Sequence, residues 1–111
     1  MYASIRGYRV KRNRLKELDR IVSEEFVPLV SKLPGFVAYF GIDQGDGKWA
    51  SISIFSSEEA AKASNKTAAE FVQKRVMPLI ESGPELTTGI VAAIGPSAHG
   101  EAAFEEPAQP H

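Results

Sequence analysis

The chain has 111 residues, 43% of them hydrophobic, which is enough for one domain with its own core and too few for a second domain. Thirteen basic and fourteen acidic side chains give a formal net charge of −1, so no overall field attracts nucleic acid or an anionic membrane surface. Cysteine is absent, which excludes disulfides and thiolate chemistry, and no apolar run is long enough to span a bilayer, so we expect a soluble cytoplasmic protein without nucleic-acid or membrane partners.

The first predicted element is a β-strand over residues 2–10, where aromatic and aliphatic side chains alternate with small or polar ones. Arg6 and Arg9 lie within it, and the alternation allows one of them to point inward. An inward arginine would hold an anionic group of a substrate, whereas the alternative is an ion pair or a rim position with the charge in water. The sequence leaves both alternatives open.

A helix is predicted next, because apolar residues recur at three- and four-residue spacing from Leu15 to Leu33, with Asn13 as the expected N-cap. Pro28 lacks a backbone N–H and crowds the carbonyl four residues back, so it must break or kink this helix. We predict a main helix to about Val27 and a short helical turn after it.

Two strands joined by a hairpin are predicted after the Pro34-Gly35 turn. Residues 36–43 and 49–55 are rich in aromatic and β-branched side chains, and the glycines between them supply positive φ angles for the hairpin. Along the second of these strands an aliphatic face, with Ile52 and Ile54, alternates with a face that is aromatic at its ends and polar between them. The latter face carries Trp49, Ser51, Ser53 and Phe55.

A second helix is expected to open on a capping box, with Ser56 as N-cap and Glu59 three residues later, and to be broken at Pro78. Gly83-Pro84 is expected to form the turn that follows. Residues 86–94 are then predicted as the last strand.

The chain contains an internal repeat, because residues 26–36 and 76–86 share a helix end with an internal proline, a Pro-containing turn and an apolar run. The order βαββαβ predicts an α+β ferredoxin-like plait, an antiparallel four-stranded sheet with two helices on one face. Since the helices cover only one face, we expect a homodimer in which a second copy covers the other. Residues 1–95 are expected to form this domain and residues 96–111 a flexible tail.

Residue content excludes several chemistries from the predicted domain. Both histidines, His99 and His111, fall in the expected tail, so the domain has no imidazole for a Ser-His-Asp triad, a zinc site or a haem ligand. Gly45-Asp46-Gly47 lies between two strands, where a hairpin turn is expected rather than a phosphate-binding loop. We expect no metal and no cofactor, and chemistry in which the substrate supplies its own reactivity.

The second helix gives the best indication of a binding site, because the side chains on its inward stripe are small at the positions where the first helix carries large aliphatic side chains. Such a stripe predicts either a pocket beneath the helix or a closer approach of helix and sheet. Asn65, the one amide on the stripe, is a candidate catalytic residue that would orient a hydroxyl or an oxyanion, and the alternative is a structural amide. The candidate substrate-binding residues are Arg6, Tyr8, Tyr39, Trp49, Ser53, Ser64 and Ala68.

Four motifs within residues 2–95 are similar to those of a known family: Val27-Pro28-Leu29, Leu33-Pro34-Gly35-Phe36, residues 50–60 and Ala69-Glu70-Phe71-Val72. They resemble the antibiotic biosynthesis monooxygenase superfamily, dimeric α/β-barrel proteins in which two plaits pack sheet to sheet. The resemblance implies a small-molecule-binding barrel. Two functions stay open: a cofactor-independent monooxygenase of an electron-rich aromatic or quinol, and a non-catalytic protein for ligand sensing or assembly.

Overall fold

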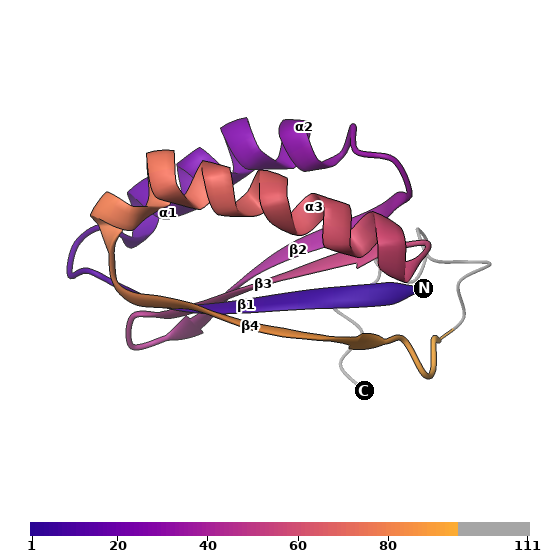
Figure 1. Ribbon diagram of the computed structural model, residues 1–111. Coiled ribbons are helices and arrows are strands. Elements are labelled where there is room, and N and C mark those ends of the chain that lie inside the picture. The colour runs from indigo at the N-terminus through magenta and orange to yellow at the C-terminus, as the bar shows by residue number, and fades with distance from the viewer. Residues whose placement is uncertain (96–111) are drawn as a thin grey trace.

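A computed structural model describes residues 1–95 and shows two layers, a four-stranded antiparallel sheet and a pair of helices on one of its faces (Figure 1). The strands lie in the order β2-β3-β1-β4, which confirms the predicted α+β ferredoxin-like plait. The expected tail, residues 96–111, lies outside the described residues. The elements are β1 (Tyr2–Val10), α1 (Leu15–Ile21), η1 (Val22–Phe26), α2 (Val27–Val30), β2 (Phe36–Gly45), β3 (Lys48–Phe55), α3 (Glu58–Phe71), η2 (Val72–Val76), η3 (Met77–Leu79) and β4 (Ile80–Ile90).

The internal repeat appears in the structure as two π-helical turns, η1 and η2, each of which ends two residues before a proline. The backbone N–H of Val27 donates to the carbonyl of Val22, and that of Met77 donates to the carbonyl of Val72, five residues back in both cases. The wider turn keeps the backbone bonded up to the residue before the proline, whose ring would crowd a regular α-helix. The expected break therefore takes the form of a change in helix type, and the expected short helical turn follows it as α2.

The sheet has two chemically different faces, and the helices cover the more polar one. Neighbouring strands pair Ser4 with Ser53 and Arg6 with Ser51, and these four side chains are buried beneath the helices. On β4 the opposite face carries Thr87 and Glu85. On β1, β2 and β3 it is built from aliphatic, aromatic and small side chains: Ala3, Ile5, Ala38, Phe40, Ile42, Ala50, Ile52 and Ile54. We call this set the open face. Ile5, Phe40 and Ile42 on it are 40%, 44% and 40% exposed.

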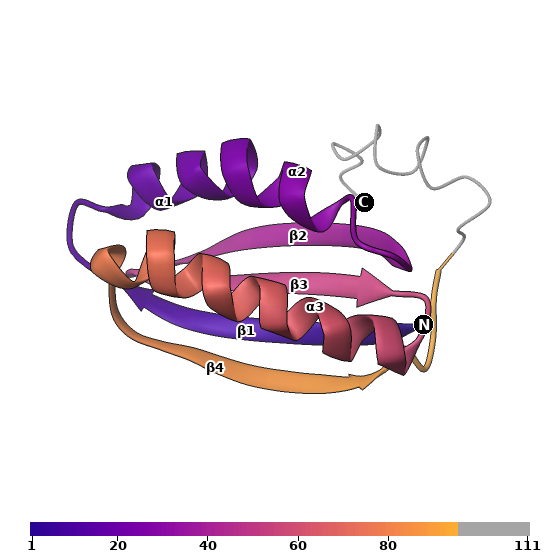
Figure 2. The same ribbon diagram turned by 45° about the horizontal axis from the view of Figure 1, so that its top comes forward.

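The two helices lie side by side over the sheet, with α3 above β1 and β3 and with α1 and α2 toward β2 (Figure 2). Their apolar stripes form most of the core, as the three- and four-residue spacing predicts. The buried residues of this stripe include Leu18, Ile21, Val22, Phe26 and Val30 from the first helix and Ala61, Ala68, Val72 and Val76 from the second.

Both predicted helix caps are wrong by one residue. Asn13 has a φ of +67°, a left-handed conformation that asparagine tolerates in turns, and the N-cap position falls on Arg14 without a side-chain hydrogen bond. At the second helix the N-cap is Ser57 rather than Ser56, and its hydroxyl accepts a hydrogen bond from the backbone N–H of Ala60 at 3.1 Å. Two adjacent serines offer the same cap, and only the backbone path decides between them.

The last strand also differs from the prediction, because β4 begins at Ile80 and already contains Gly83-Pro84, the expected turn. The Gly83-Pro84 peptide bond is cis, and the pairing of β1 with β4 shifts register in this region. A proline is tolerated here because β4 is an edge strand and one row of its backbone groups needs no partner strand. None of the helices within residues 1–95 has both the length and the apolar content to cross a membrane.

Gly41 on β2 is required by the indole of Trp49, and this contact yields a stability prediction. A Cβ added at Gly41 would lie 2.8 Å from Trp49 Cζ2, closer than any real contact, so Gly41→Ala should lower the free energy of unfolding by about 1–3 kcal/mol. Gly95→Ala is the control, because it lies outside the strands and a Cβ there meets nothing within 4 Å. Urea denaturation of both variants checks the prediction, and equal stabilities would contradict it.

Candidate functional site

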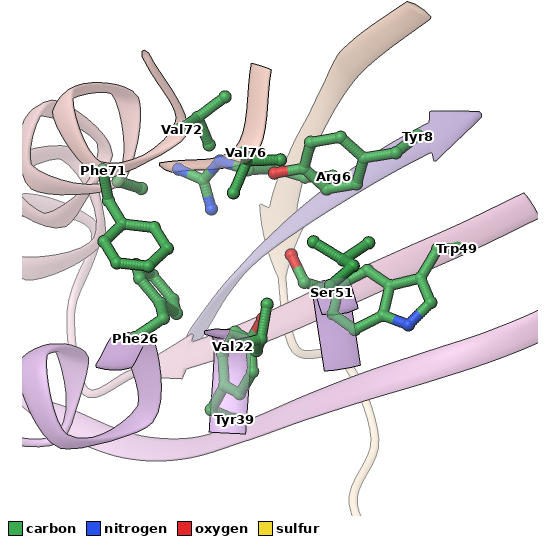
Figure 3. Close-up of a pocket in the computed structure, with 12 residues that line it drawn as sticks. Arg6, Tyr8, Val22, Phe26, Tyr39, Trp49, Ser51, Phe71, Val72 and Val76 are labelled. Atoms are coloured by element: carbon green, nitrogen blue, oxygen red, sulfur yellow. The ribbon is translucent and has the colours of Figure 1, made fainter. Parts of the chain in front are cut away.

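A small cavity lies between the helices and the sheet, with a polar floor and an apolar roof (Figure 3). Its volume is about 20 Å³, which is room for about one water molecule. The floor comes from three strands: Arg6 and Tyr8 on β1, Tyr39 on β2, and Trp49 and Ser51 on β3. The roof consists of Leu18, Val22, Phe26, Ala68, Phe71, Val72 and Val76.

The two π-helical turns form much of the roof, since η1 contributes Val22 and Phe26, and η2 contributes Val72 and Val76. The rings of Phe26 and Phe71 lie 5.0 Å apart between their centres and close the space between the helices. On the outer side Arg75 donates two hydrogen bonds to the carboxylate of Glu25, at 2.7 and 2.8 Å, and these hydrogen bonds, together with the charge of Arg75, lower the pKa of Glu25. This exposed ion pair joins η1 to η2. The repeat therefore positions the roof over the floor.

Arg6 is the most unusual side chain of the floor, because it is only 5% exposed and has no acidic partner within the part of the chain that the structure describes. Its Nη2 donates to the Oδ1 of Asn65 on α3 at 2.6 Å, and the hydroxyl of Ser4 donates to the same oxygen at 3.3 Å. None of the carboxylates in residues 1–95 forms an ion pair with Arg6. Burial lowers the pKa of Arg6, but an arginine stays protonated in a protein. The floor therefore carries a positive charge that no carboxylate neutralises.

Two tyrosines accompany this charge, and Figure 3 shows the hydroxyl of Tyr8 directed toward the guanidinium of Arg6. Burial raises the pKa of Tyr8 to about 12, against the opposing effect of Arg6. Burial also raises the pKa of Tyr39, against the effect of a hydrogen bond with Ser51. Both phenols are therefore neutral at pH 7 and serve as hydrogen-bonding groups rather than as bases.

Trp49 forms the end of the floor toward β2 and is held in one orientation. Its Nε1 donates to Oδ1 of Asp19 on α1 at 2.9 Å, while Gly41 leaves room for the ring. Tyr8 lies against it, with ring centres 6.2 Å apart. A rigid indole of this kind defines the width of the cavity.

Two grooves flank the cavity on opposite edges of the sheet. We call the first the β4 groove: it has a volume of about 220 Å³, and Arg6, Asn65, Val72, Gln73, Met77 and Leu86 are among the residues that line it. Arg6 and Val72 also line the cavity and so form the wall between the two spaces. We call the second the β2 groove: it has a volume of about 370 Å³, and Asp19, Ser23, Tyr39, Asp43 and Trp49 are among its lining residues.

The structure brings most of the candidate site residues to one place, around the cavity and the β4 groove. Asn65 lies in the β4 groove, hydrogen-bonded to Arg6, and Arg9 turns away to the hairpin, where it donates to the carbonyl of Asp46. Ser64 is bonded to the Ala61 carbonyl within its own helix and lines none of these spaces. The candidates that line the cavity are Arg6, Tyr8, Tyr39, Trp49 and Ala68.

Ser51, and not the candidate Ser53, lines the cavity. Ser53 is buried outside the cavity, and its hydroxyl has no hydrogen-bond partner among the described residues. Ser51 lines the cavity and was not among the candidates. Its alternation with Trp49 and Ser53 was the available signal, because residues two apart on a strand share a face. Within residues 1–95 no three His, Cys, Asp or Glu side chains gather to hold a metal ion.

Comparison with known proteins extends the fold assignment. No protein-family model and no curated protein matches the chain. Among solved structures it is similar to a protein of unknown function from Nitrosomonas europaea, with 20% identity over 86% of this chain and 93% of that one and a TM-score of 0.74. It is also similar to a proposed antibiotic biosynthesis monooxygenase from the same organism, with 14% identity over 84% and 100% of the two chains and a TM-score of 0.70.

A third similar structure is a monooxygenase of Streptomyces coelicolor in complex with nanaomycin D, with 17% identity over 86% of this chain and 91% of that one and a TM-score of 0.69. At these identities the likeness concerns the fold. The predicted resemblance to antibiotic biosynthesis monooxygenases is thereby confirmed for the fold, while a specific activity is not.

The contact between Arg6 and Asn65 yields a prediction about stability. Asn65→Leu removes the acceptor of a buried guanidinium and should lower the free energy of unfolding by about 1–3 kcal/mol. In a chain that already carries Arg6→Met the guanidinium is gone, so Asn65→Leu should then lower the free energy of unfolding by much less. Asn65→Asp keeps the acceptor and adds a countercharge, so at pH 7 it should be at least as stable as the parent chain.

The pH dependence expected for Asn65→Asp follows from the direction of the pKa shift of the new carboxyl. An ion pair with Arg6 would lower the pKa of the new carboxyl in the folded state, so the added stability is fully present above its unfolded pKa of about 4 and is lost progressively as the pH falls from there through the lowered folded pKa. Urea denaturation at pH 7 and pH 3.5 measures both effects. If the losses of stability in Asn65→Leu and Arg6→Met simply add in the double mutant, the 2.6 Å contact between the two side chains does not stabilise the fold.

Proposed function

We propose that the chain is a small-molecule-binding protein of the antibiotic biosynthesis monooxygenase type that oxidises an electron-rich phenol or quinol without a bound cofactor. The observation that carries the proposal is Arg6, a buried cation without a carboxylate partner, set among hydroxyl groups beneath an apolar roof. Burying such a charge costs several kcal/mol, so a site that retains one gains most by binding an anion. The fold shared with a monooxygenase that binds nanaomycin D supports the choice of an aromatic ligand.

The chemistry follows from which groups at the site can exchange a proton at neutral pH. Burial raises the pKa of Tyr8 to about 12 and also raises that of Tyr39, so both phenols stay protonated at neutral pH and cannot accept a proton from a substrate. No histidine or carboxylate lines the cavity among the described residues. The substrate must therefore bind as its own anion, or ionise because Arg6 stabilises the phenolate or enolate. The protein's part is to hold that anion and to exclude water.

Oxygenation of such an anion balances without a further reductant. The substrate releases one proton to solvent when it forms its anion, and the electron-rich carbanion then transfers one electron to dioxygen. The radical pair combines to a peroxide anion, which takes a proton back from solvent to become a hydroperoxide, and loss of water leaves a carbonyl, so that CH₂ and O₂ become C=O and H₂O. Arg6 would stabilise the oxyanion before the electron leaves it, and the hydroxyl groups of Tyr8 and Ser51 lie along the same floor. Dioxygen is the only co-reactant.

A non-catalytic ligand-binding protein is the second candidate, and the size of the cavity favours it. A cavity that binds benzene measures on the order of 150 Å³, whereas this one measures about 20 Å³. A ring therefore enters the cavity only if Phe26 and Phe71 move apart. A protein that closes around a ligand without turning it over would have the same construction.

Oxygen consumption separates the two functions. With a panel of hydroquinones and anthrones, the chain should consume oxygen above the spontaneous rate, and Arg6→Met should reduce the rate at low substrate by about 10²-fold or more. Arg9→Met is the matched control, because Arg9 is an exposed arginine on the same strand and should leave the rate unchanged. An oxygen electrode makes the measurement. Ligand binding without oxygen uptake would reject the oxygenase and support the second candidate.

The proposal includes a homodimer, which the open face supports. Ile5, Phe40 and Ile42 on that face are each about two-fifths exposed, on a sheet whose helices cover the other side. Contiguous apolar surface of this kind marks an interface in soluble proteins. A second copy is the expected occupant, because the family that the chain resembles packs two plaits sheet to sheet.

Light scattering coupled to gel filtration tests the dimer directly. The parent chain should have twice its 12.1 kDa monomer mass at micromolar concentration. Ile52→Lys places a charge at the centre of the open face and should give the monomer mass, since an unpaired charge in an interface costs several kcal/mol. Lys62→Glu, an exposed charge change on α3, should leave the dimer intact. A monomeric parent chain would refute this part of the proposal.

A further inference from the structure

The β4 groove and the cavity differ in size in a way that bears on where a ligand binds. The groove measures about 220 Å³ and the cavity about 20 Å³, and a space of roughly 150 Å³ suffices for a benzene ring. A single ring therefore fits the groove without any movement of the helices, and does not fit the cavity. Arg6 lines both spaces, so a ligand in the groove reaches the same cation as a ligand in the cavity.

The groove combines apolar walls with hydrogen-bonding groups at its inner end. Met77 and Leu86 line it and are 40% and 50% exposed, which is unusual for large apolar side chains beside a core. Arg6 and Asn65 lie at the inner end, joined by the 2.6 Å hydrogen bond, and the amide of Gln73 lines the helical side. A flat ring would cover the apolar walls while its charged substituent met Arg6.

Charge distinguishes this groove from the one on the opposite edge. The β2 groove is lined by Asp19 and Asp43 and by no cation, whereas none of the described residues that line the β4 groove is acidic. An anion approaching the helix-sheet gap is repelled at the β2 edge and attracted at the β4 edge. The β2 groove is the larger of the two, so charge rather than space favours the β4 edge.

We infer that the β4 groove binds the ring of a small planar aromatic anion, with the charged oxygen of the ligand on Arg6 and the ring between Leu86 and the π-helical turn η2. The inference deepens the proposed function and rests on it for the view that the ligand is a small aromatic molecule. It adds the ligand's charge, its size of about one ring and its route to Arg6. A phenolate and an aromatic carboxylate share this chemistry, and the test separates them.

Calorimetric titration with three probes of similar shape tests the charge requirement. Benzoate, a nitrophenol ionised at the working pH, and neutral benzamide differ in the group that would meet Arg6. Either anion should bind about ten-fold or more tightly than benzamide, because a hydrogen bond to a charged group is involved. The tighter of the two anions identifies the oxygen that the site prefers. Equal binding of benzamide and both anions, or no binding of any, would overturn the inference.

Blocking each groove in turn tests the location. Leu86→Trp fills the β4 groove from an exposed position on an edge strand and should weaken anion binding by about ten-fold or more, and Gln73→Trp should do the same from the helical wall. Ser23→Trp is the matched control in the β2 groove and should have no effect. Circular dichroism confirms the fold of each variant. Weaker binding in Ser23→Trp with normal binding in both β4 variants would place the site at the other edge.

The same variants separate this inference from the proposed function. Anion binding that Leu86→Trp abolishes, in a chain that consumes no oxygen, would leave the groove as the ligand site and remove the oxygenase. Oxygen uptake that neither Leu86→Trp nor Gln73→Trp alters would support the oxygenase and reject the groove. Asn65→Asp adds a negative charge beside Arg6 and should weaken binding of the anions without weakening that of benzamide.

Discussion

The two faces of the sheet are arranged so that polar side chains lie under the helices and isoleucines point away from them, and most other features follow from this arrangement. Arg6 and the serines of β1 and β3 are buried beside α3, where Asn65 supplies the acceptor for the guanidinium. A buried charge with one neutral partner is costly for a fold that needs only stability. The cost is understandable if the site serves an anionic ligand. The same arrangement leaves the open face apolar and without a covering layer within residues 1–95.

The two copies of the internal repeat lie next to each other in the structure, which the sequence alone does not show. The residues before Pro28 and Pro78 form two π-helical turns fifty positions apart, and these turns lie together over the polar floor. Glu25 and Arg75, also fifty positions apart, join the turns through a two-pronged ion pair at the surface. π-Helical turns recur near functional sites because they displace side chains from regular helical positions. Here they place Phe26 and Val76 on the roof of the cavity.

Arg6 connects the cavity, the β4 groove and α3, and this position makes it the centre of the proposed site. It lies in the wall between the two spaces, so movement of a ligand from the groove toward the cavity would pass its guanidinium. Tyr8 and Tyr39 add hydroxyl groups whose raised pKa keeps them neutral. A site that has one cation, neutral donors and no base among the described residues matches chemistry in which the ligand brings its own reactivity.

The sequence by itself determined the order of the elements, the four-stranded plait and the helical stripes, because periods of two and of three to four residues report local geometry directly. It also indicated two chemically distinct faces on β3. It placed the start of the last strand wrongly, since the dipeptide Gly83-Pro84 is typical of a turn but here lies within an edge strand, and it did not single out Ser51. Only the tertiary structure decided which face of the sheet the helices cover, because alternation separates two faces without saying which is inside. The contact of Arg6 with Asn65, fifty-nine residues away, depends on that choice, and so do the cavity and the β4 groove.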